Sequence, residues 1–108
     1  MNKFAKVIID RPLGSYHPTH KDICYTVNYG YIPGTIAGDL EEQDAYILGV
    51  DIPLQEFEGK VIAIIHRKDD IEDKWVVIPT GTKLSEKQIQ ELVHFQEQYF
   101  DIFIEMLI

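Results

Sequence analysis

The sequence is poor in cysteine, in positive charge and in long apolar runs, and each shortage excludes a class of protein. Cys24 is the only cysteine, so no disulfide can form within the chain. Lys and Arg total 10 against 18 Asp and Glu, and the net charge of -8 opposes binding to nucleic acid and to anionic membranes. No apolar run approaches the ~20 residues of a membrane-spanning helix, and the first residues lack an apolar segment of secretory length. We therefore expect a cytoplasmic protein with no nucleic-acid or membrane partner.

What the sequence does contain predicts one domain, residues 1–108, of mainly β or α+β class. Apolar and β-branched stretches bounded by Gly, Pro and acidic residues predict strands over residues 4–9, 23–31, 45–50, 60–66 and 74–79. The pair Ser85 and Gln88 forms a capping box, which predicts the start of a helix. Helical spacing of apolar residues continues to Phe103, and residues 99–108 hold more of them than one helix face buries. That excess predicts either an intersubunit contact or burial against the β-structure.

Two acidic stretches, residues 39–44 and 69–73, each run directly into a predicted strand. Carboxylates at this density repel one another unless a cation lies among them, and Mg²⁺ and Mn²⁺ favour such oxygen ligands. The alternative is a pair of solvated acidic turns, which are common on protein surfaces. If a shared cation binds, the fold must bring the two stretches together.

An irregular segment, residues 10–22, carries Arg11, His17 and His20 in an otherwise acidic protein. The histidines are candidates for metal or phosphate contacts, or are ordinary exposed loop residues. Beyond them Tyr25, Tyr29 and Tyr31 alternate with period two and share one face of a predicted strand. Their rings either line a pocket or pack in the core.

These segments together resemble soluble family I inorganic pyrophosphatases. Residues 25–35, YTVNYGYIPGT, are similar to the family segment in which Asn-Tyr-Gly leads through a turn to Thr. The family's Asp-x-Asp-x-x-Asp metal signature has its counterpart in Asp39, Glu41 and Asp44, with Glu at the middle position. The acidic hairpin before Lys74 and the segment HFQEQY at residues 94–99 complete four landmarks in the family's order.

The resemblance implies a small OB-like β-barrel of about five strands with one C-terminal helix packed on it. It also implies hydrolysis of pyrophosphate with Mg²⁺ or Mn²⁺, and a homo-oligomer, since bacterial members form hexamers. The residues carried over are the metal ligands Asp39, Glu41, Asp44, Asp70 (or its neighbour Asp69) and Asp73, the catalytic carboxylates Glu41 and Asp44, and the phosphate contacts Tyr29, Lys74 and Tyr99.

The sequence departs from the family where phosphate is clamped. The chain is too short before Tyr25 for the family's basic hairpin, and Phe100 replaces the lysine after the helix tyrosine. Arg11 is the best remaining substrate-binding candidate there, beside the two loop histidines and Lys21. Each charge-assisted hydrogen bond lost costs ~1.5–3 kcal/mol, so we expect slow turnover. The alternatives are a non-catalytic, oligomeric binder of a metal or a phosphate-bearing ligand, and a hydrolase of another phosphorylated substrate.

Overall fold

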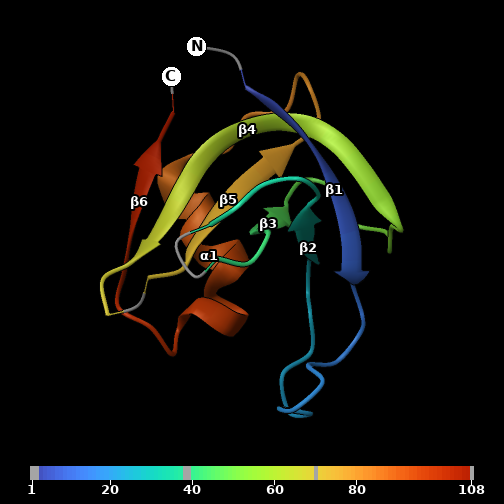
Figure 1. Ribbon diagram of the computed structural model, residues 1–108, viewed down its shortest axis with the longest axis vertical. Coiled ribbons are helices and arrows are strands. Elements are labelled where there is room, and N and C mark those ends of the chain that lie inside the picture. The colour runs from blue at the N-terminus through green and yellow to red at the C-terminus, as the bar shows by residue number, and fades with distance from the viewer. Residues whose placement is uncertain (1–2, 38–39, 70, 108) are drawn as a thin grey trace.

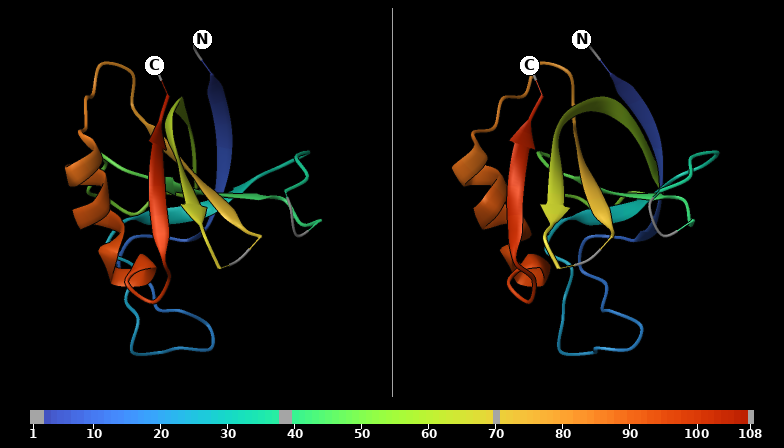
Figure 2. Two further views of the ribbon diagram at one scale, coloured as in Figure 1. Left: turned by 90° about the vertical axis from the view of Figure 1, so that its left-hand side faces the viewer. Right: turned by 60° about the vertical axis from the view of Figure 1, so that its left-hand side comes forward.

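A computed structural model of the protein describes residues 3–37, 40–69 and 71–107. Along the chain they form β1 (Phe4–Arg11), β2 (Asn28–Ile32), β3 (Gln43–Ile47), β4 (Glu56–Arg67), β5 (Asp73–Ile78), α1 (Glu86–Glu97) and β6 (Ile102–Met106). Figure 1 shows the strands wrapped into a small barrel, and Figure 2 shows α1 at one side of it, next to β6.

The barrel closes because β1 pairs with both β2 and β4. The strand order is β1-β2-β3-β5-β4, and all neighbours are antiparallel except β3 and β5, which are parallel. Each of these five strands therefore has a neighbouring strand on both sides over at least part of its length. The predicted barrel of about five strands with one helix is therefore confirmed.

The long strand β4 makes closure possible by curving from one partner to the next (Figure 1). Its residues 56–60 pair with β1, and its residues 60–66 pair with β5. Gly59 lies at this changeover, where a Cβ would come 2.4 Å from the carbonyl oxygen of Ile78. Only glycine allows the backbones to approach this closely.

Helix α1 buries Ile89 and Val93 against one side of the barrel wall, in a core cluster that includes Tyr46 and Ile78. The predicted capping box is confirmed, because the Ser85 side chain accepts a hydrogen bond from the Gln88 backbone and the Gln88 side chain accepts one in return. A second cluster, containing Ala5, Val7, Ile9, Ile32, Ala45, Ile47, Val61 and Val77, fills the barrel interior. Within the described part of the chain, no helix is long and apolar enough to cross a membrane.

The C-terminal segment departs from the sequence prediction. The helix ends at Glu97, and Ile102–Met106 forms strand β6 instead of continuing the helical pattern to Phe103. β6 pairs with residues 63–67 of β4, on the edge that β1 leaves unpaired beyond Lys60. The predicted strand over 23–31 is also shorter, because β2 begins at Asn28.

Segment 12–27 joins β1 to β2 as a long excursion beyond the barrel. Figure 2 shows it projecting past the same end of the molecule at which α1 finishes, whereas the two chain termini lie at the opposite end. The excursion and the end of α1 therefore lie at the same end of the molecule.

Candidate active site

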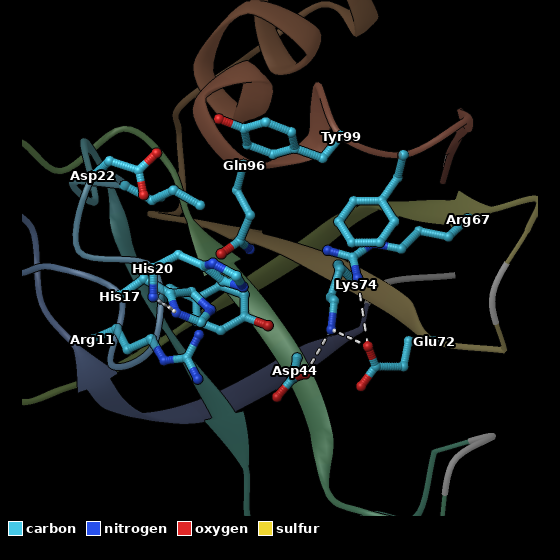
Figure 3. Close-up of a pocket in the computed structure, with 13 residues that line it drawn as sticks. Arg11, His17, His20, Asp22, Asp44, Arg67, Glu72, Lys74, Gln96 and Tyr99 are labelled. Atoms are coloured by element: carbon cyan, nitrogen blue, oxygen red, sulfur yellow. Dashed lines mark hydrogen bonds and ion pairs between the residues drawn. The ribbon is translucent and has the colours of Figure 1, made fainter.

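A cavity of about 590 Å³ opens at this end of the molecule, between the β1–β2 excursion, the first residues of β3 and β5, and the end of α1. Figure 3 shows the side chains that line it. They are Arg11, His17, His20, Asp22, Ile23, Tyr29, Asp44, Arg67, Glu72, Lys74, Gln96, Tyr99 and Phe100. In a chain of net charge -8, three Lys or Arg side chains and two histidines thus face one space.

The parallel pairing of β3 with β5 creates one wall of the cavity. It aligns Asp44 with Lys74, which are 30 residues apart in sequence. The Lys74 ammonium is 2.7 Å from Asp44 Oδ2 and 3.4 Å from Glu72 Oε2 (Figure 3). Because Lys74 is almost fully buried, its charge depends on these two carboxylates.

Strand alternation decides which acids of the second acidic turn reach the cavity. Glu72 and Lys74 lie two residues apart and share a face, so both line the cavity. Asp73 is on the other face, where its Oδ1 is 3.3 Å from His66 Nδ1. His66 in turn contacts Glu105 of β6 at 2.8 Å.

Tyr29 and Arg11 form a second wall of the cavity, next to the excursion. Burial, reinforced by the charge of Asp44, raises the pKa of Tyr29 well above 10. The phenol therefore stays protonated at neutral pH and serves as a hydrogen-bond donor. The Arg11 guanidinium carbon lies 5.6 Å from the ring centre of Tyr25 and 5.5 Å from that of Tyr29, and Nη1 donates to the Tyr25 hydroxyl at 2.6 Å. Although burial alone would lower the pKa of Arg11, the bond to Tyr25 raises it overall, so Arg11 is a permanent cation.

Arg67 of β4 enters the cavity from behind Lys74. Its Nε donates to Glu97 Oε1 at 3.0 Å and its Nη2 donates to Glu97 Oε2 at 2.7 Å, a bidentate pair in which both side chains are at most 5% exposed. Phe100 stacks on the guanidinium, 3.6 Å from ring centre to carbon. Nη1 also reaches Glu72 Oε2 at 3.4 Å, which links this pair to the wall of Lys74 and Asp44.

A buried chain of hydrogen bonds connects the two walls through the end of α1. The Tyr25 hydroxyl donates to Gln96 Oε1, and Gln96 Nε2 donates to the Tyr46 hydroxyl at 2.6 Å. Tyr46 then donates to Glu97 Oε2 at 2.6 Å. The last turn of α1 therefore positions Arg11, through Tyr25, and Arg67 at the same time.

The structure brings together five of the nine site residues predicted from the sequence: Arg11, Tyr29, Asp44, Lys74 and Tyr99 all line the cavity. Glu41 is exposed and Asp73 faces His66, and neither lines it. Asp39 and Asp70 lie outside the described residues.

Sequence reasoning missed Glu72, Arg67 and Gln96 as cavity residues. Period-two alternation from Lys74 would have found Glu72, since it selects residue 72 over 73. Arg67 continues the buried alternation of Ala63 and Ile65, and an arginine at a buried position signals a partner or a site. Gln96 had no comparable local signal.

Two carboxylates of the cavity are of the type that a hard divalent cation prefers. Within the described part of the chain, no group of three or more His, Cys, Asp and Glu side chains is placed to hold a metal ion. Asp44 and Glu72 nevertheless converge on one point, which the Lys74 ammonium occupies. Mg²⁺ is commonly held by one or two carboxylates with the remaining ligands from water and substrate phosphate, so these two acids fit it.

A closed five-stranded barrel with one helix packed on it, and a cavity lined by charged side chains of both signs, defines a small OB-like β-barrel protein. The sequence model described as inorganic pyrophosphatase matches residues 3–105. The chain therefore belongs to the inorganic pyrophosphatase family, a family of inorganic diphosphatases.

Solved structures agree on the fold. The inorganic pyrophosphatase of Ehrlichia chaffeensis is 19% identical with a TM-score of 0.74, and the match covers 96% of this chain and 86% of that one. The enzyme of Coxiella burnetii is 19% identical with a TM-score of 0.68, covering 96% and 83%. That of Neisseria gonorrhoeae is 20% identical with a TM-score of 0.68, covering 89% and 73%. Comparison with curated protein sequences finds no significant match.

Proposed function

We propose that this protein hydrolyses pyrophosphate to two phosphates with Mg²⁺ or Mn²⁺ as cofactor. One observation carries the proposal: a single cavity gathers Arg11, Tyr29 and Lys74 as donors, with Asp44 and Glu72 as acceptors. Such a set suits phosphoanhydride cleavage, in which positioning and charge neutralisation supply most of the catalysis. Membership of the pyrophosphatase family supports pyrophosphate as the substrate.

Each cavity residue then has a role. Arg11 grips one phosphoryl group through its planar fork, and Tyr29 and the exposed Tyr99 donate hydroxyl protons to phosphoryl oxygens. Lys74 neutralises charge next to Asp44. When bound, a divalent cation supplies charge neutralisation on the phosphates and lowers the pKa of a water toward ~7.

Asp44 accepts the proton of the attacking water. The water oxygen bonds to one phosphorus, the bridging P–O bond breaks, and the second phosphate leaves with the bonding electron pair. Asp44 and Glu72 would hold the cation, with Asp39, Glu41 and Asp70 remaining predicted ligands from the two acidic turns. Asp73 is the weakest candidate, because it faces His66.

A phosphate-release assay tests the proposal. We expect phosphate release from pyrophosphate with Mg²⁺ or Mn²⁺, and a fall to background in Asp44→Asn, which keeps the shape of the side chain and removes its charge. Glu58→Gln removes one negative charge from an exposed position of β4 and is the matched control. Release by Asp44→Asn at the rate of the parent protein contradicts the role of this carboxylate.

A non-catalytic binding function is the second candidate, favoured by one observation. The Lys74 ammonium lies where a cation shared by Asp44 and Glu72 would bind. If the parent protein releases no phosphate yet is stabilised by metal or pyrophosphate, the binding function replaces the hydrolase. Release from another phosphate ester or anhydride instead identifies a changed substrate.

A further inference from the structure

The β1–β2 excursion is an ordered unit that fixes the position of its histidines. The backbone N–H of Gly14 donates to the carbonyl of Tyr25 at 2.7 Å, and that of Tyr25 donates to Ser15 at 2.8 Å. Further along, the N–H of His17 donates to the carbonyl of Ile23 at 2.9 Å. Because these bonds tie the two sides of the excursion together, His17 is held at the cavity wall (Figure 3).

The surroundings of the His17 ring select one tautomer. Its Nδ1 lies 3.1 Å from the backbone nitrogen of Thr19 and 3.1 Å from that of His20, and both hydrogen bonds are donated to the ring. A backbone N–H cannot accept a proton, so Nδ1 must present its lone pair. The ring proton therefore sits on Nε2, on the edge that faces away from the turn.

The same geometry keeps the imidazole neutral. A proton on Nδ1 would point at two N–H donors. Partial burial, followed by the charges of Arg11 and His20, lowers the pKa of His17, while the opposing charge of Asp22 raises it. Ring contacts with Tyr25, at 6.4 Å and 14°, and with His20, at 4.9 Å, restrict the orientation of the ring.

His17 Nε2–H is thus a preset donor. Over residues 3–37, 40–69 and 71–107 it has no hydrogen-bond partner, although the ring lines a cavity shared with Arg11. A neutral N–H directed at a phosphate oxygen gives a charge-assisted hydrogen bond without a further buried cation.

We propose that His17 binds substrate directly, donating its Nε2–H to a phosphoryl oxygen of the pyrophosphate gripped by Arg11. This inference rests on the proposed function and deepens it. It assigns part of the phosphate binding to a neutral histidine that lines the same cavity as the Arg11 cation. Thr19 and His20 are positioning residues, because their backbone N–H groups fix the tautomer.

Two amide substitutions of His17 separate the role of the Nε2–H donor from the role of Nδ1, which accepts hydrogen bonds within the turn. His17→Asn keeps an acceptor near the Nδ1 position and loses the donor at Nε2. His17→Gln carries an amide N–H near the Nε2 position and loses the acceptor within the turn. His17→Ala loses both.

We expect KM for pyrophosphate to rise about tenfold to a hundredfold in His17→Asn and His17→Ala, and clearly less in His17→Gln. The thermal midpoint should stay near that of the parent protein in His17→Asn and should fall in His17→Gln and His17→Ala. If His17→Asn has the KM of the parent protein, or if His17→Gln is as impaired as His17→Ala, His17 only stabilises the turn and the proposal is overturned.

Imidazole ¹⁵N NMR with inorganic phosphate as the probe separates this inference from the proposed function. The spectrum should show the Nε2–H tautomer of His17, and its Nε2 resonance should shift on addition of phosphate with Mg²⁺. A shift in a protein that hydrolyses no pyrophosphate supports the phosphate contact while the proposed function fails. An unmoved resonance in a protein that does hydrolyse pyrophosphate refutes the contact alone.

Discussion

Replacing Glu97 by Gln should destabilise the whole protein, because Glu97 is the main counter-charge of a buried arginine. Glu97 is 2% exposed, and its carboxylate accepts two hydrogen bonds from Arg67 and a third from Tyr46. Gln keeps the shape but removes the charge of the bidentate pair, and the contact of Arg67 Nη1 with Glu72 Oε2 is longer, at 3.4 Å. Breaking a buried ion pair from one side costs about 3–5 kcal/mol.

That loss is a large share of the ~5–15 kcal/mol by which a domain is stable. With a shift of about 4–8 °C per kcal/mol for a domain of this size, the thermal midpoint should fall by at least about 12 °C. Thermal and urea unfolding, followed by circular dichroism at one protein concentration, measure the change. Lys68 and Asp101, an exposed pair 3.9 Å apart, provide the control, and Asp101→Asn should cost less than about 1 kcal/mol.

A double substitution tests the cause. Arg67→Met with Glu97→Met replaces both charges by apolar groups of similar length and should recover most of the loss, because the cost lies in a buried guanidinium that has lost its bidentate counter-charge. A cost below about 1 kcal/mol for Glu97→Gln alone would refute the dependence of Arg67 on Glu97. A double variant no more stable than Glu97→Gln would show that the Tyr46 contact and packing matter more than the charge.

Three further predictions concern the cofactor, the substrate and the assembly. Millimolar Mg²⁺ or Mn²⁺ should raise the thermal midpoint, and EDTA should reverse the rise. A ligand at 100 times its Kd adds about 2.7 kcal/mol to the free energy of unfolding. An unchanged thermal midpoint argues against a metal site at the acidic turns. Arg11→Lys keeps the charge but loses the planar guanidinium, whose Nη1 donates to the Tyr25 hydroxyl, so kcat/KM for pyrophosphate should fall about tenfold or more. Unchanged kinetics would show that Arg11 does not bind the substrate. Light scattering should return an oligomer, because Phe103 and Met106 of β6 are exposed; a 12.5 kDa species at micromolar concentration contradicts this assembly.

Local sequence signals determined most of the secondary structure and the chemical character of the site. Apolar and β-branched stretches bounded by Gly, Pro and acidic residues located the barrel strands, and Ser85 with Gln88 fixed the start of α1 through contacts three residues apart. The tyrosine segment and the acidic stretch before β3 indicated the family, to which the sequence match assigns the chain. These features depend on near neighbours in the chain, which is why they can be read without a structure.

The tertiary structure decided which of these residues meet. The apolar residues 102–106 suit helix or strand equally, and the unpaired stretch of β4 beyond β1 made them a strand. The parallel register of β3 and β5 set Lys74 against Asp44, and the pleat of β5 turned Glu72 into the cavity and Asp73 away from it. The pairing of Arg67 with Glu97 joins residues 30 positions apart across the barrel wall. Such contacts depend on strand register and on the direction of each side chain, which are set by the packing of the whole chain and not by any single segment.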